Sequence, residues 1–96
     1  MHVLALELDI RVRSSRSLKE KRAMVRPVID GIRHRYPVAV AETGHQDKRQ
    51  RAGVGVAIVS ASVTHAEQVI DDVERFVWSF PDLEVIQSCR CWMEQG

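Results

Sequence analysis

Residues 4–13 read LALELDIRVR, in which large apolar side chains recur at every second position and charged side chains stand between them from Glu7 on. An alternation with a period of two is typical of a strand with one buried face and one exposed face. The run therefore predicts a strand from Leu4 to Arg13. A short loop follows, and then comes Ser17-Leu18-Lys19-Glu20. Ser17 and Glu20 have the spacing of a capping box, which predicts that a helix begins here.

The predicted first helix continues to the residue before Pro37, because proline disfavours helical angles in the residue that precedes it. Pro27 lies inside this helix and removes one backbone hydrogen bond, so we expect a kink there. The apolar side chains that recur at helical spacing, and so mark the buried face, are Leu18, Val25, Val28, Ile29, Ile32 and Tyr36.

The rest of the chain repeats this pattern of strands around a helix. We expect strands at Val38–Thr43 and Ala52–Ser60, joined by the polar hairpin from Gly44 to Arg51. Thr64 and Glu67 form a second capping-box pattern, followed by the apolar stripe Ala66, Val69, Ile70, Val73, Val77 and Phe80. Pro81 closes that helix, Leu83 to about Trp92 is the last strand, and Met93–Gly96 is a short tail.

The order strand–helix–strand–strand–helix–strand predicts the α+β class and a ferredoxin-like βαββαβ sandwich. Two right-handed split βαβ units place both helices on one face of a four-stranded antiparallel sheet. The fourth and first strands are then neighbours, the third lies beside the first, and the second is at an edge. Ninety-six residues suffice for one domain, which we expect to span residues 1–96.

Composition indicates an ordinary globular protein of the cytoplasm. Hydrophobic residues are 45% and charged residues 28% of the chain, which excludes disorder. The apolar runs are too short for a membrane span, and Glu7 and Asp9 interrupt any N-terminal leader. Two cysteines without an export signal indicate a reducing compartment. We expect no membrane association and no cofactor.

Charge is distributed unequally along the chain. Residues 1–55 hold 12 basic and 6 acidic side chains, whereas residues 56–96 hold 2 and 7. Such a bipolar chain could attract a polyanion with one face or pair its two halves within a dimer. A plain solvated surface remains the alternative, because exposed charges often contribute little.

Several segments resemble the YlxP-like family of small bacterial proteins, a domain of unknown function. They are Ser17–Arg22 (SLKEKR), Val40-Ala41-Glu42, His45-Gln46-Asp47, Gln50-Arg51-Ala52 and Gly55–Ser60. The resemblance extends from about Leu4 to Trp92. It implies a ferredoxin-like fold and a gene that is often encoded beside genes for translation and ribosome maturation. It implies no established reaction.

The turn before the first helix is the strongest candidate binding site. Its serines precede a helix N-terminus, whose free amides and positive dipole favour an anion. Capping by Ser17 and Glu20 is the structural alternative, and Glu20 competes for the same amides. The hairpin could add electrostatic contacts to nucleic-acid phosphates. The predicted anion or nucleic-acid contacts are Arg13, Arg16, Lys19, Arg22, Lys48, Arg49 and Arg51.

The hairpin also carries His45 and Asp47, which with Glu42 could hold a metal or form an acid–base pair. A catalytic metal needs three ligands of fixed geometry, so we favour a role in holding the hairpin through backbone hydrogen bonds, and we predict no metal. Acylphosphatases share the fold, but their glycine-rich cradle is missing here and the chain has no Asn to position a water. We therefore expect no catalytic residues.

Cys89 and Cys91 have half of a metal-site pattern, and antiparallel pairing could bring His2 near Cys91. Three ligands make a weak zinc site, so two buried thiols are the preferred interpretation. Trp78 and Trp92 are expected to be packing residues. The predicted open face of the sheet has no ring on its first or third strand, which argues against base stacking of the RNA-recognition-module type. Its small residues instead suit close approach by a second copy: Ala39, Ala41, Gly55, Ala57 and Val59.

These features together predict a non-enzymatic protein that associates with RNA or the ribosome, with ribosomal RNA or a ribosome-assembly factor as its partner, and that forms a homodimer. The alternative is a homo-oligomeric interaction module that does not bind nucleic acid. A third and weaker alternative is a small-anion enzyme or sensor that uses Arg16 and His45.

Overall fold

The computed structural model describes residues 1–93, and residues 94–96 of the predicted tail lie outside that range. Four strands and two helices follow one another in the βαββαβ order predicted from the sequence. Their bounds are β1 (His2–Val12), α1 (Leu18–Arg35), β2 (Ala39–Gly44), β3 (Arg51–Ser60), α2 (Val63–Trp78) and β4 (Leu83–Met93).

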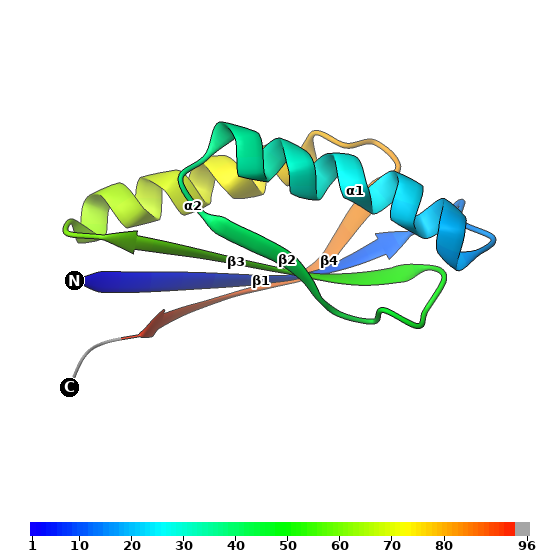
Figure 1. Cartoon of the computed structure of the whole chain (residues 1–96), viewed down its shortest axis with the longest axis horizontal. Coiled ribbons are helices and arrows are strands. Elements are labelled where there is room, and N and C mark those ends of the chain that lie inside the picture. Colours follow the sequence, from blue (N-terminus) through cyan, green and yellow to red (C-terminus); the bar gives the residue numbers. More distant parts are fainter. Residues whose placement is uncertain (94–96) are drawn as a thin grey trace.

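The strands form one antiparallel sheet in the order β2-β3-β1-β4, as predicted. Both helices cover the same face, and the other face is left open (Figure 1). The ferredoxin-like fold is therefore confirmed. The molecule is elongated, with extents of 43 × 24 × 19 Å. The start of α1 and the β2–β3 hairpin lie at one end of it, away from the N-terminus of the chain (Figure 1).

The core lies between the helices and the covered face. The alternating apolar side chains of β1, from Leu4 to Val12, are at most 1% exposed. Against them pack Val28 and Ile32 of α1 and Ile70 of α2. Burying one such side chain contributes about 1.5–3 kcal/mol, so this layer fixes the positions of the strands and hence of the loops at their ends.

The first helix begins as the capping pattern predicts. The Ser17 hydroxyl accepts from the Glu20 amide at 3.1 Å, and the Glu20 carboxylate accepts from the Arg16 amide at 2.8 Å. The helix continues through Pro27 and ends at Arg35, just before Tyr36 and Pro37.

The predicted start of the second helix is wrong. Ser62, not Thr64, is its N-cap: the Ser62 backbone is extended, and its hydroxyl accepts from the His65 amide at 3.2 Å. Thr64 lies inside the first turn. Ser62 and Thr64 are both possible caps, and the prediction chose Thr64 because only Thr64 has a Glu three positions later.

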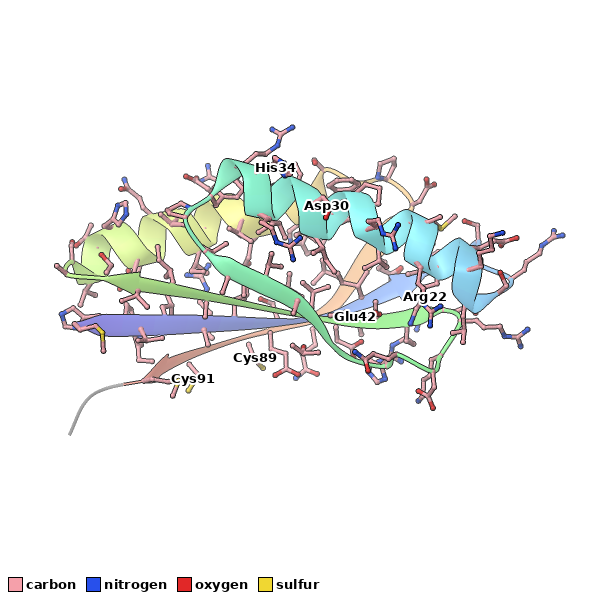
Figure 2. The ribbon with its side chains drawn as sticks, viewed as in Figure 1. Arg22, Asp30, His34, Glu42, Cys89 and Cys91 are labelled. Carbon is pink, nitrogen blue, oxygen red and sulfur yellow. The ribbon has the colours of Figure 1, made fainter. Side chains whose placement is uncertain are left out.

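Both cysteines are exposed, so the prediction of buried thiols is wrong. In the β1–β4 register Cys89 lies opposite Glu7 and Cys91 opposite Ala5. These positions belong to the open face, and Figure 2 shows both thiols on the side away from the helices. The His2 ring packs edge-on against Trp92, 6.4 Å between centroids, and within residues 1–93 no three metal-ligating side chains form a cluster.

The two tryptophans differ in environment. Trp92 packs against the core, as predicted, whereas Trp78 at the end of α2 is 61% exposed and is not a packing residue. Within residues 1–93, no helix has the length and apolar character needed to span a bilayer.

Candidate nucleic-acid interface

A buried lysine connects α1 to the base of the β2–β3 hairpin. The Lys21 side chain is fully buried, and its ammonium donates to the carbonyl oxygens of His45 at 2.7 Å and Arg51 at 3.1 Å. These two carbonyls stand at the end of β2 and the start of β3. An unsatisfied buried ammonium would be very costly, so the hairpin supplies the acceptors that this lysine needs. Lys21 therefore fixes where the hairpin leaves the sheet.

Glu42 completes the environment of this ammonium. Its Oε2 lies 3.2 Å from Lys21 Nζ. Within the described residues this buried oxygen makes no well-directed hydrogen bond, so the ion pair with Lys21 compensates its burial. The view with side chains shows Glu42 on β2 beneath α1 (Figure 2). The pair links the SLKEKR segment to the second strand.

A second set of contacts joins the hairpin to the turn between β1 and α1. The Arg49 guanidinium donates to the Arg16 carbonyl at 3.4 Å, and the Gln50 amide donates to the Ser15 carbonyl at 3.3 Å. The Val12 amide also donates to the Gln50 carbonyl at 2.9 Å. Two basic segments that are far apart in the sequence are thus held side by side.

Five of the predicted cations in these segments are exposed and form no ion pair within residues 1–93. Lys19 lies in the first turn of α1, where the helix dipole disfavours a positive charge. Its placement gains nothing for the stability of the helix and suits an external anion. We call the following group the basic end: Arg16, Lys19, Arg22, Lys48 and Arg49.

The other two predicted contacts are engaged by carboxylates. Arg13 pairs with Glu84 of β4, and Arg51 pairs with Asp9 of β1 on the open face. Arg26, which the prediction did not include, is exposed one turn after Arg22 and forms no ion pair within residues 1–93. It extends the row of cations along α1.

The helix N-terminus itself is occupied by its own side chains. Ser17 and Glu20 accept from the amides of Glu20 and Arg16, so the capping alternative is confirmed. A phosphate at this end would therefore be met mainly by cationic side chains rather than by helix amides.

The hairpin histidine faces the sheet. His45 Nε2 lies 3.6 Å from Asp9 Oδ1, and Arg51 Nε donates to the same oxygen at 3.1 Å. The hydrogen bonds from Arg51 hold the pKa of Asp9 below its usual value, against the opposing effect of partial burial. His45 has a φ of 56°, which is uncommon for a residue with a side chain. Two hydrogen bonds to the His45 carbonyl, from the Lys21 ammonium and from the Lys48 backbone amide, hold the residue in this conformation.

Asp47 does not join His45 in a site. Asp47 is exposed at the hairpin tip, and no cluster of three metal-ligating side chains occurs in the part of the chain that the structure describes. The hairpin is held through the His45 carbonyl rather than through the side chains of His45 and Asp47. The predicted metal alternative therefore has no support in the geometry.

The predicted dimer-face residues all belong to the open face. Ala39 pairs with Ala57 and Ala41 with Gly55, and Val59 is 63% exposed. A shallow, mainly apolar hollow of about 360 Å³ lies over four of these residues, Ala39, Ala41, Gly55 and Ala57, and over Ala5, and Glu7 and Thr43 also line it. We call it the sheet hollow.

Sequence reasoning missed Lys21, although its position gives a signal. Residues 18, 21, 25, 28 and 32 follow helical spacing, so a lysine stands on the apolar stripe of α1. A lysine at such a position predicts a buried partner. The partners of Lys21 are carbonyl groups at the base of the hairpin, and no local sequence pattern predicts that the hairpin lies beside this helix.

Comparison with known proteins agrees with the fold. The protein named "Uncharacterized protein YlxP" of Bacillus subtilis (strain 168) is 38% identical over 68 residues, which are 71% of this chain and 74% of that protein. The de novo designed protein Foldit4 has a TM-score of 0.57 at 10% identity over the full length of both chains. The designed protein LFR1 1 with ferredoxin fold has a TM-score of 0.53 at 15% identity, over 99% of this chain and 88% of that one. At such identities the designed proteins support the fold alone.

A family model described as "Protein of unknown function (DUF503)" matches residues 3–90, nearly the whole chain. The segments that resemble the YlxP-like family all lie within that match. This chain belongs to the DUF503 family, which includes YlxP-like proteins.

Proposed function

We propose that this protein is a non-enzymatic, cytoplasmic RNA-binding protein whose basic end contacts the phosphates of ribosomal RNA. One observation carries the proposal: the contact between Arg49 and the Arg16 carbonyl places two unpaired basic segments at the same end of the molecule. Cations of one sign that gather on a rigid end raise the local potential and attract a polyanion.

The geometry supports binding through the phosphate backbone rather than through base stacking on the sheet. The open-face positions of β3 are small or aliphatic from Gly53 to Val59, and those of β1 carry no ring. Arginine and lysine contacts to phosphates position an RNA without reading its sequence. Affinity for such a ligand falls as salt rises, because the counterions that binding releases from the RNA gain less entropy when the surrounding salt is more concentrated.

The test is a salt titration of binding to a labelled single-stranded fragment of ribosomal RNA, followed by fluorescence anisotropy. For single strands the slope of log K against log salt is about −0.7 per neutralised phosphate. The double variant Arg16→Glu, Arg49→Glu is expected to bind at least about tenfold more weakly at low salt, with a shallower slope.

Arg75→Glu is the matched control, because Arg75 lies on α2 and already pairs with Asp72. It is expected to bind nearly as the original protein does. A protein that binds no RNA at low ionic strength, or a double variant with unchanged affinity and slope, would contradict the proposal.

The second candidate is self-association through the open face, which the sheet hollow favours. Sheets that pack face to face lie about 10 Å apart, and small residues such as Ala41 and Ala57 allow that approach. A second copy fits this surface better than RNA does, because its hollow is mainly apolar and holds no cation. The protein would then be a homodimer.

Sedimentation equilibrium of Ala57→Arg tests the homodimer. The original protein is expected at twice the chain mass of 10.9 kDa and the variant at the single mass. The control Ala61→Arg introduces the same side chain at an exposed position after β3 and is expected to remain dimeric. A monomeric original protein at high concentration would exclude this candidate.

A further inference from the structure

A second hollow, of about 290 Å³, lies on the open face beside the hairpin. We call it the hairpin hollow. Its floor is β1 at Glu7 and Asp9, and its walls come from His45 on one side and from Gln87 and Cys89 on the other. Its volume is near the lower bound of the ~300–1,000 Å³ typical of ligand pockets, which suits a single ring system.

Two glycines make this hollow. Gly53 lies opposite Asp9 in the β1–β3 register, so the residue paired with Asp9 adds no side chain there, and from β3 the Arg51 side chain reaches the carboxylate. A Cβ on Gly53 would lie 2.9 Å from the Cα of Gly44, where the β2–β3 register shifts. The close approach of β3 to β2 therefore requires glycine at position 53, whereas a Cβ on Gly44 would lie at an ordinary contact distance of 3.8 Å.

The polar groups of the hollow are not equivalent. Both oxygens of Asp9 are engaged by Arg51, and one of them also faces His45. Glu7 is exposed and forms no ion pair or side-chain hydrogen bond within residues 1–93. Gln87 donates only a long 3.8 Å contact to the Cys89 sulfur. The free acceptor in the hollow is thus a single carboxylate, with an amide close to it.

An aromatic ring lines the same hollow as that carboxylate. The His45 side chain is 31% exposed where it lines the hollow. Histidine is one of the rings on which unstacked RNA bases stack. A flat ligand that stacks on His45 and presents two adjacent N–H donors would satisfy both Glu7 oxygens. Among the RNA bases, guanine has this pair on its Watson–Crick edge, whereas uracil and adenine lack it.

We propose that the hairpin hollow takes an unpaired guanine base of the bound RNA, which stacks on His45 and donates to the Glu7 carboxylate. The inference rests on the proposed function, because the same hairpin carries Lys48 and Arg49 for the phosphates. It adds a base preference to an interface that is otherwise indifferent to sequence. His45 then has two roles in the interface: its carbonyl accepts a hydrogen bond from the Lys21 ammonium, and its ring stacks on the base.

The test uses guanosine and inosine monophosphates with the full-length, ¹⁵N-labelled protein under reducing conditions at low salt. Inosine keeps the ring N–H of guanine and lacks the exocyclic amine, so it loses one donor to Glu7. The guanine nucleotide is expected to shift the amide signals of Leu8, Asp9, His45 and Gly53, and the inosine nucleotide to bind about tenfold more weakly.

Glu7→Gln should remove this difference between the two nucleotides, because the new amide cannot accept both donors. Glu67→Gln on α2 is the matched control and should retain the difference, since Glu67 is an exposed glutamate on the opposite layer. Circular dichroism verifies that both variants are folded.

Equal affinities for the two nucleotides in the original protein, or an unchanged preference in Glu7→Gln, would overturn the inference. If RNA binding still depends on Arg16 and Arg49 in that case, the proposed function stands without a base pocket. The reverse result is a guanine preference at the hollow in a protein that binds no RNA. It would overturn the proposed function and also the claim that the guanine in the hollow belongs to an RNA.

Discussion

Lys21 occupies a position of α1 at which an apolar side chain would be expected. It is fully buried and has three acceptors: the carbonyls of His45 and Arg51 and the carboxylate of Glu42. A buried ammonium is tolerated when all its donors are used. Lys21 therefore contributes polar contacts that join α1 to the hairpin, in place of the apolar packing that another residue would give at this position.

Lys21→Met should destabilise the protein by about 3–4 kcal/mol, the lower part of the range for breaking a buried pair, because Glu42 is partly exposed. The variant removes the ammonium that donates to the His45 and Arg51 carbonyls and leaves the Glu42 carboxylate without its counter-ion. Urea denaturation measures the loss. Lys21→Met with Glu42→Leu should recover part of it, because the orphaned charge is gone. A single variant as stable as the original protein would contradict this role.

Asp9 gives the protein a pH-dependent contribution to stability. Its folded-state pKa lies below the ordinary value of 3.8, chiefly through the Arg51 hydrogen bonds. A lowered pKa stabilises the fold above the unfolded pKa, and the stability is lost as pH falls through the folded pKa. Asp9→Asn should therefore lower Tm at pH 7 and have a smaller effect at pH 3, because part of this stability is lost below the unfolded pKa.

Asp82→Asn is the control for that measurement. Asp82 is exposed between α2 and β4 and forms no ion pair within residues 1–93, so its variant should show the same small Tm difference at both pH values. An Asp9→Asn effect that is equal at pH 7 and pH 3 would mean that the carboxylate charge is not what stabilises the hairpin.

At the scale of elements, α2 offers a comparison of two neighbouring hydroxyls. Ser62 accepts from the His65 amide, whereas Thr64 lies inside the first turn. Ser62→Ala should cost about 1 kcal/mol, and Thr64→Ala should change stability by less than ~0.5 kcal/mol. Chemical denaturation of the two variants measures the difference. A larger loss in the threonine variant would place the cap where the sequence pattern put it.

The elements themselves were predictable from local patterns. The alternation of β1, the Ser17 cap and the stop before Pro37 are each decided by residues near one another, and the structure confirms them. Strand order followed from the handedness of two crossovers rather than from any residue. The burial of Cys89 and Cys91 could not be predicted from local patterns. Two residues at positions i and i+2 of a strand share a face of the sheet, but only the register with β1 shows that this is the open face.

The candidate site was predictable only in part, for a related reason. The basic residues of the turn and of the hairpin are visible in the sequence, but their neighbourhood depends on long-range contacts such as Arg49 to Arg16. Which cations are neutralised is also decided at long range, since Arg13 meets Glu84 and Arg51 meets Asp9 only in the folded chain.

At the scale of the whole molecule, the excess of basic side chains in the first half leaves several cations without an ion pair within residues 1–93. The acidic second half uses part of its charge internally: Arg90 of β4 is held by Asp71 and Glu74 of α2. The five cations of the basic end lie on the start of α1, the turn before it and the hairpin, and Figure 1 shows these segments at one end of the molecule. An approaching polyanion therefore meets this end first.

The most direct measurement is a map of RNA contacts on the ¹⁵N-labelled protein, with a single-stranded ribosomal RNA fragment at low salt and again at high salt. The account predicts that signals of residues 14–22 and 45–51 shift at low salt and that the shifts fade at high salt. Shifts that centre on α2 or on the far ends of β1 and β4, or shifts that salt leaves unchanged, would contradict it.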